Sequence, residues 1–326
     1  MDTDKLFSLR SEEDFNTFSI EIFNFQYLNN KIYSAFVKQF NIEPSSVKQY
    51  SQIPFLPVEF FKTHDVICGK KKTSDIIFTS SSTTSQIPSQ HIVSDISVYE
   101  KSFLKGFEFF YGSPKDYAII ALLPNYLERK GSSLVYMFEK LIQLSGNPKS
   151  GFFLEDYTKL KSVVSDLKKS NQKTLLIGVT YALLNLAEQD CKLNDNFTVM
   201  ETGGMKGRRN ELLKEELHAI LKEKLNATNI HSEYGMTELL SQAYSKGNGL
   251  FDCPPWMRVL VRDTEDPLSF VKENKTGGLN IIDLANINSC SFIATQDLGR
   301  IKSNGQFELM GRFDNSDIRG CNLMVE

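Results

Sequence analysis

Eight consecutive residues combine side chains that can bind a phosphate and a metal ion. The stretch from His231 to Glu238 contains a glycine, two hydroxyl groups, a tyrosine and two carboxylates. A strand that ends near Tyr234 would place Thr237 and Glu238 at its carboxyl end, where open α/β sheets bind their ligands. Thr237 would then donate a hydrogen bond to a phosphate, and Glu238 would hold a divalent cation. The alternative is a surface turn with a solvated glutamate, and these eight residues alone do not decide between the two.

A second polar stretch follows the short apolar run at 76–78. It consists of seven consecutive hydroxyl residues, namely Thr79, Ser80, Ser81, Ser82, Thr83, Thr84 and Ser85. Hydroxyls and backbone amides in a loop after a strand suit a polyphosphate. A flexible hydroxyl-rich linker is the alternative. The strand that leads in, and the helical pattern that begins at Tyr99, favour the phosphate loop.

Two further segments carry candidate ligand contacts. Gly203 and Gly204 lie between a predicted strand at 197–200 and a predicted helix at 210–225, and adjacent glycines let a ligand lie against the backbone. A plain glycine turn beside a solvated basic segment is the alternative. Near the C-terminus, Asp297 and Arg312 flank a predicted hairpin. Taken alone, that pair favours a structural salt bridge.

The elements around these residues indicate an α/β fold. Apolar runs at 117–123 and 173–180 are typical of buried parallel strands, and strands alternating with helices indicate βαβ units. Residues 11–40 have a helical pattern, and its apolar stripe is expected to be core. The stripe consists of Phe15, Phe18, Ile22, Phe25, Leu28, Ile32, Phe36 and Phe40. Prolines at 54 and 57 then predict an extended connection.

Composition narrows the class of protein. The chain has 326 residues, 41% of them hydrophobic and 24% charged, which is ordinary for one large or two medium globular domains. A net charge of -3 without a long basic stripe makes nucleic acid an unexpected partner. Without a membrane-length apolar run or a signal-peptide pattern, a cytoplasmic protein with no membrane span is expected. Five widely spaced cysteines without a CxxC pair suggest neither a disulfide framework nor a zinc site.

The two polar stretches together resemble a known superfamily. Thr79 to Ser85 resembles the Ser/Thr/Gly-rich phosphate loop of the adenylate-forming acyl-CoA synthetases and ligases, and Tyr234-Gly-Met-Thr-Glu238 is similar to another of their signatures. More closely, the chain from about Ile53 onward resembles the acyl-protein synthetases of the LuxE family. The resemblance implies the large N-terminal domain of these enzymes, with mixed sheets flanked by helices and no complete C-terminal lobe. It implies a helical segment at 1–52, a catalytic domain at 53–312 and a hinge and tail at 313–326.

The resemblance also implies ATP and Mg²⁺ as cofactors and assigns roles to residues. Thr237, Glu238 and Cys321 would be catalytic, and Glu238 would be the metal ligand. The residues implied to bind the nucleotide are Thr79, Ser80, Ser81, Ser82, Thr83, Thr84, Gly203, Gly204, Tyr234, Gly235, Asp297 and Arg312. His231 could orient the carboxylate of the substrate, although a structural histidine is the favoured interpretation.

The implied reaction is ATP-dependent activation of a fatty acid to an acyl-adenylate. The acyl group would pass to Cys321 and then to an acyl-acceptor protein, such as a fatty acid reductase. One departure concerns Ser82 and Ser85, because the superfamily usually has glycine at the first position and often at the second. Serine there could weaken nucleotide binding. Two alternatives therefore stay open: another acyl- or aryl-CoA ligase, and a non-catalytic relative that binds a nucleotide or an acyl group.

Overall fold

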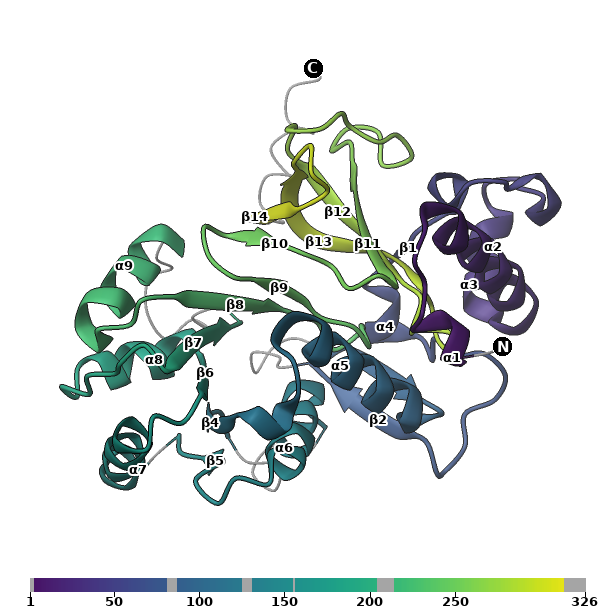
Figure 1. Cartoon of the computed structure of the whole chain (residues 1–326). Coiled ribbons are helices and arrows are strands. Elements are labelled where there is room, and N and C mark those ends of the chain that lie inside the picture. Colours follow the sequence, from purple (N-terminus) through teal and green to yellow (C-terminus); the bar gives the residue numbers. More distant parts are fainter. Residues whose placement is uncertain (1–2, 81–86, 125–130, 155, 204–213, 314–326) are drawn as a thin grey trace. The chain divides into compact units, whose positions relative to one another are not determined.

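The computed structural model describes residues 3–80, 87–124, 131–154, 156–203 and 214–313 (Figure 1). The chain forms two compact units. The first comprises Met1–Asp75, His91–Ser94 and Pro255–Glu326, and the second comprises Ile76–Gln90 and Asp95–Pro254. These units group the residues differently from the predicted ranges 1–52, 53–312 and 313–326. Those ranges describe the extent of a catalytic domain, and they stay a prediction.

The second unit is built on a mostly parallel sheet (Figure 1). The strand order is β5-β4-β6-β7-β8-β9. The strands are β4 (Ala118–Leu122), β5 (Gly151–Phe152), β6 (Thr174–Val179), β7 (Phe197–Thr202), β8 (Ile230–Tyr234) and β9 (Ala243–Ser245). Neighbours from β5 to β8 are parallel, and β9 pairs with β8 in the antiparallel sense. The predicted βαβ organisation is therefore confirmed for this unit.

The sequence explains why these strands are central. Every residue of β4 and β6 is buried, as expected of strands covered on both faces. The helices are α5 (Ile96–Tyr111), α6 (Ser133–Ser145), α7 (Tyr157–Lys169), α8 (Thr180–Ala187) and α9 (Lys214–Leu225). Side chains of Asp95, Ser132 and Asp156 accept hydrogen bonds from amides in the first turns of α5, α6 and α7. The shorter elements of this unit are β2 (Ile76–Thr79), η3 (Pro114–Asp116) and β10 (Leu250–Phe251).

The first unit contains an antiparallel sheet in the order β14-β13-β12-β11. Its strands are β11 (Met257–Arg262), β12 (Gly277–Asp283), β13 (Phe292–Ile301) and β14 (Phe307–Arg312), and β1 (Leu56–Pro57) pairs with β13 in parallel. The predicted hairpin is confirmed. Gly305 has φ +84° and donates its amide to the carbonyl of Lys302 at 2.9 Å, which closes the turn.

Helices complete the first unit. They are α1 (Thr3–Leu6), α2 (Glu12–Asn29), α3 (Lys31–Lys38), α4 (Phe60–Thr63), η1 (Pro44–Ser46) and η2 (Tyr50–Gln52). The strand β3 (Gln90–Val93) begins in the second unit and ends in this one.

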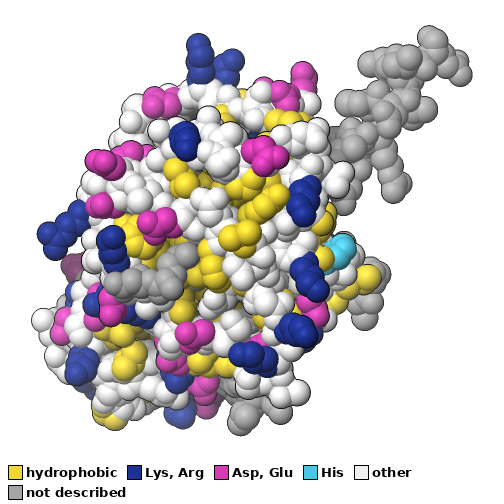
Figure 2. Space-filling model, turned by 90° about the vertical axis from the view of Figure 1, so that its right-hand side faces the viewer, with side chains coloured by type: hydrophobic (Ala, Val, Ile, Leu, Met, Phe, Trp, Pro, Cys, Tyr) yellow, Lys and Arg dark blue, Asp and Glu magenta, His cyan; other side chains and the backbone are white. Residues whose placement is uncertain are grey.

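Figure 2 shows one face of the molecule, with acidic and basic side chains interspersed. The face shown therefore has no large patch of side chains that all carry the same charge.

The predicted helix at 11–40 is interrupted, and five of the eight residues in its apolar stripe are not fully buried. Asn30 has extended backbone angles between α2 and α3, and its side chain accepts the amide of Tyr33 at 3.0 Å. The break turns the buried face, so that Tyr33 and Val37 are buried in α3. Leu28 is 80% exposed, and the stripe residues Phe25, Ile32, Phe36 and Phe40 are only partly buried. A capping side chain thus overrides the periodicity.

Candidate functional site

The stretch from Tyr234 to Glu238 lies where the sequence predicts it. The strand β8 ends at Tyr234, and the amide of Leu239 donates to the carbonyl of Met236 at 3.1 Å, forming a turn. Glu238 is 5% exposed, and Thr237 is partly buried. A buried carboxylate thus follows the carboxyl end of a parallel strand, the usual position of ligand-binding groups in such sheets.

The tyrosine of this stretch is held by its own turn. The Tyr234 hydroxyl donates to the Met236 sulfur at 3.6 Å, and its ring contacts Phe251 edge-on at a centroid distance of 6.1 Å. Gly235, by contrast, is exposed. An exposed glycine after a fixed aromatic ring leaves backbone that a flat ligand can approach.

The predicted glycine turn begins at the neighbouring strand. Gly203 follows β7 directly with φ +66°, and its carbonyl accepts a hydrogen bond from the Thr180 hydroxyl at 2.8 Å. Because β7 and β8 are adjacent and parallel, this turn and the turn after Tyr234 start from the same edge of the sheet. Gly204 and the basic residues that follow lie outside the described residues.

Glu233 is a site residue to which the sequence assigned no role. It pairs in register with Thr202 of β7, and the Thr202 hydroxyl donates to Glu233 Oε2. Glu233 is 6% exposed, and burial raises its pKa to about 7. The Thr202 hydrogen bond opposes this rise, while the nearby Glu201 carboxylate adds to it. The only signal in the sequence was a second carboxylate within the polar stretch.

We expect this carboxyl group to make stability depend on pH. The folded protein keeps the proton that an unfolded chain releases near pH 4.5, so the free energy of unfolding falls as pH rises from there to about 7. The full loss is roughly 3 kcal/mol for a shift of this size. Replacing Glu233 by glutamine removes the titrating group and should flatten this dependence.

Urea unfolding of wild type and Glu233→Gln across this pH window measures the effect. Glu223→Gln, which changes an exposed glutamate on α9, is the matched control. If Glu233→Gln loses as much stability as wild type over this window, Glu233 does not titrate there.

The surroundings of His231 favour a structural role over a catalytic one. Its Nδ1 lies 3.2 Å from the Tyr111 hydroxyl, and the two rings are 5.8 Å apart between centroids. Burial lowers the pKa of His231 to about 4, so the ring is neutral at neutral pH. A neutral, partly buried imidazole packed on α5 fits the structural role that the sequence favoured.

The hydroxyl-rich stretch is described only at its start. The Thr79 amide donates to the Gly131 carbonyl at 2.7 Å, and the Ser80 amide donates to the Ser89 carbonyl at 3.1 Å. The Ser89 amide returns a hydrogen bond to the Ser80 hydroxyl at 2.9 Å. These bonds hold Thr79 and Ser80 at the start of the predicted phosphate loop. Ser81, Ser82, Thr83, Thr84 and Ser85 lie outside the described residues, as does Cys321.

Asp297 and Arg312 are brought together within the first unit. They are register partners on β13 and β14, and Arg312 Nε lies 2.8 Å from Asp297 Oδ1. The Asp297 amide donates to the Thr295 hydroxyl at 3.1 Å. Asp297 is 6% exposed, whereas the Arg312 side chain is 72% exposed. This geometry suits a structural salt bridge and also a ribose-binding pair, so the predicted role stays a prediction.

The described side chains offer few ligands for a metal ion. Within those ranges, no three His, Cys, Asp or Glu residues cluster as ligands of an ion. Mg²⁺ in nucleotide enzymes is usually held by one or two carboxylates together with substrate phosphates. A single buried carboxylate at Glu238 therefore fits a magnesium ion that arrives with a nucleotide, and does not fit a preformed protein cage.

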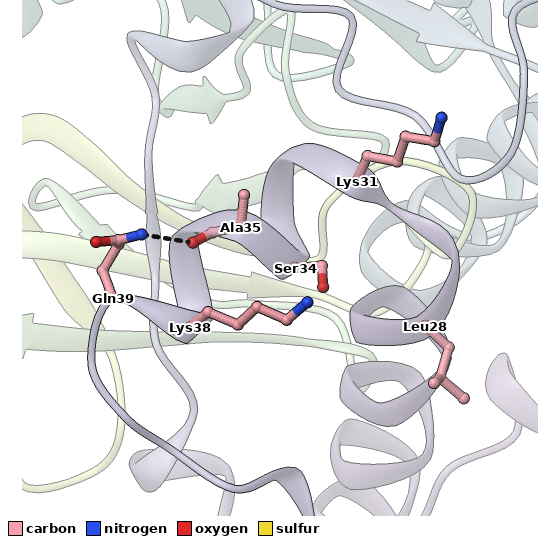
Figure 3. Close-up of a pocket in the computed structure, with 6 residues that line it drawn as sticks. All are labelled: Leu28, Lys31, Ser34, Ala35, Lys38 and Gln39. Carbon is pink, nitrogen blue, oxygen red and sulfur yellow. Dashed lines mark hydrogen bonds between the residues drawn. The ribbon is translucent and has the colours of Figure 1, made fainter.

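An open hollow elsewhere in the first unit has different chemistry. It measures about 370 Å³ and is formed by α2 and α3 (Figure 3). Its lining residues are Leu28, Lys31, Ser34, Ala35, Lys38 and Gln39. Aliphatic groups, two amines, a hydroxyl and an amide supply no carboxylate or thiol, so we assign it no catalytic role.

The fold is that of the adenylate-forming ligases. An open conformation of 2-hydroxyisobutyryl-CoA ligase in complex with 2-HIB-AMP and CoA matches with a TM-score of 0.70 at 12% identity, covering 93% of this chain and 70% of that one. ATP-bound MatB from Rhodopseudomonas palustris matches with a TM-score of 0.55 at 18% identity, covering 75% of this chain and 50% of that one. The chain thus spans about half the length of MatB. Curated protein sequences gave no match.

The family follows from the sequence itself. The family model described as "Acyl-protein synthetase, LuxE" matches residues 5–326. The chain belongs to this family and is a ligase. The match includes the N-terminal helices, which the resemblance noted from about Ile53 did not cover. Among the described residues, no helix is both long and apolar enough to cross a membrane.

Proposed function

We propose that this protein activates a fatty acid with ATP, carries the acyl group on its own cysteine and delivers it to an acceptor protein. The observation that carries the proposal is the acyl-protein synthetase match over residues 5–326. The arrangement of two polar turns at the carboxyl ends of β7 and β8 supports it, because such edges bind nucleotides in open α/β sheets.

In the first half-reaction, a fatty acid carboxylate attacks the α-phosphate of ATP. The bond between the α- and β-phosphates breaks, giving acyl-adenylate and pyrophosphate. Thr237 would donate to the α-phosphate, and Glu238 would hold Mg²⁺, which neutralises charge along the phosphates when bound. The loop from Thr79 to Thr84 would bind the departing pyrophosphate through hydroxyls and amides.

The residues that would bind the rest of the nucleotide are those that the family resemblance implies. Gly203, Gly204, Tyr234 and Gly235 would border the adenine. Asp297 would accept hydrogen bonds from the ribose hydroxyls, and Arg312 would pair with ribose or phosphate. The burial of Asp297 beside an exposed guanidinium supports this assignment.

In the second half-reaction, the thiolate of Cys321 attacks the acyl-adenylate carbonyl. A thioester forms, AMP leaves with the bonding electron pair, and the thiol proton goes to solvent. In the proposed mechanism, Gly320 would allow the chain to bend near the thiol, and Arg319 would lower the thiol pKa. Transfer to a thiol of an acceptor protein, such as a fatty acid reductase, would then release the acyl group.

Two other functions have specific support. One of the matched solved structures is a CoA ligase in complex with CoA, so transfer to CoA is one alternative. Ser82 stands where the superfamily usually has glycine, which supports a relative that binds nucleotide without turnover.

One set of measurements separates the three functions. Wild-type protein is incubated with ATP, Mg²⁺ and labelled saturated fatty acids of several lengths. ATP–pyrophosphate exchange, label retained on protein and CoA-dependent AMP release are then measured. We expect ATP–pyrophosphate exchange that depends on the fatty acid, with label retained on the protein. Label released only to CoA would support the CoA ligase, and ATP binding without exchange would overturn the proposed activity.

A further inference from the structure

We propose that Thr202 and Glu233 form a clamp that positions the two nucleotide-binding turns at the ends of β7 and β8. The inference rests on the proposed function, because the clamp has a catalytic consequence only if these turns bind ATP. Glu233 would be a positioning residue and would not touch the nucleotide.

The clamp joins two segments that are distant in sequence. Thr202 is the last residue of β7 and directly precedes Gly203, while Glu233 directly precedes Tyr234. The hydrogen bond from the Thr202 hydroxyl to Glu233 Oε2 therefore connects the starts of both turns. Both residues are at least 94% buried, so water does not compete well for this bond.

The other oxygen of Glu233 lies directly under the second turn. A Cβ atom added at Gly235 would lie 2.5 Å from Glu233 Oε1 and 3.4 Å from Gln242 Cγ. Real side chains essentially never come so close, so the carboxyl group fills the space beneath Gly235. One carboxyl group thus accepts a hydrogen bond from Thr202 of β7 with one oxygen and lies against Gly235 with the other.

A second hydrogen bond extends the connection to β6. The Thr180 hydroxyl, which directly follows β6, donates to the Gly203 carbonyl at 2.8 Å. The ends of three adjacent parallel strands are therefore linked by side chains. Preorganised supports of this kind reduce the cost of ordering a ligand site.

The groups around the clamp determine the charge state of Glu233. The titratable groups that face it are Glu201 of β7, Lys214 of α9, Tyr111 of α5 and Tyr244 of β9. Lys214 already pairs with Glu201 at 2.7 Å. A proton on Glu233 thus avoids a second buried negative charge, while the Thr202 hydrogen bond favours the ionised carboxylate, so Thr202 can donate to Glu233 in either charge state.

The test measures fatty-acid-dependent ATP–pyrophosphate exchange as a function of ATP concentration. Thr202→Val and Glu233→Ala should each raise the KM for ATP on the order of tenfold, the usual effect of removing one buried hydrogen bond, with kcat changing less. Thr202→Ser keeps the hydroxyl and should restore the KM. Glu233→Gln keeps an oxygen that can accept from the Thr202 hydroxyl and should raise the KM less than Glu233→Ala does.

Controls separate positioning from folding and from the proposed function. Thr198→Val on the same strand and Glu223→Gln on α9 repeat the chemical changes away from the clamp, and thermal melting monitors folding. The inference is overturned if wild type exchanges and Thr202→Val or Glu233→Ala leaves the KM for ATP unchanged. It is also overturned if Thr202→Ser does not restore the KM. Failure of wild type to exchange would instead reject the proposed function.

Discussion

Replacing Glu238 by alanine is expected to lower ATP–pyrophosphate exchange by about a hundredfold to a thousandfold, the range for losing a main stabiliser of developing charge. Glu238 is 5% exposed at the carboxyl end of β8, and it is the carboxylate to which the proposed mechanism assigns Mg²⁺. Without it, the ion would be held by phosphates alone. The charge that forms as pyrophosphate leaves would then lose a fixed partner.

Exchange measured over a range of Mg²⁺ concentrations checks this prediction. The variant should need more Mg²⁺ than wild type, because the protein ligand of the ion is missing. Glu223→Gln removes an exposed carboxylate from α9 and should exchange like wild type. Near-normal exchange by Glu238→Ala, with an unchanged Mg²⁺ requirement, would exclude Glu238 as the metal ligand.

Replacing Cys321 by serine is expected to abolish acyl label on the protein while exchange continues. The two half-reactions use different groups, so losing the thiol should stop only the second. Three of the other four thiols are poor substitutes: burial raises the pKa of Cys68 to about 12, and it raises the pKa of Cys191 and Cys290 as well. Few thiolates would form at these positions near neutral pH.

Gel autoradiography after incubation with labelled fatty acid measures the retained group, and hydroxylamine release identifies a thioester. Cys253→Ser is the matched control, because Cys253 is a partly exposed thiol elsewhere in the chain. Label that persists in Cys321→Ser but disappears in Cys253→Ser would show that Cys253, and not Cys321, carries the acyl group. Loss of exchange in Cys321→Ser would show that the two half-reactions are not separable as proposed.

Patterns within short segments of the sequence determined several strands and turns of this protein. Continuous apolar runs predicted the buried strands β4 and β6, and Asn304-Gly305 predicted the hairpin between β13 and β14. The end of β8 at Tyr234 also followed from the sequence, so the position of Glu238 at a strand end was predictable. These features depend on side-chain periodicity and turn chemistry within a few residues.

Only the tertiary structure decided which distant groups meet. Thr202 and Glu233 are 31 positions apart, and their bond exists because β7 and β8 are neighbours in register. The break at Asn30 is similar, because the Asn30 side chain donates to the Ser289 carbonyl at 3.0 Å, 259 positions away. Burial and pKa depend on such non-local neighbours, which no pattern within one segment contains.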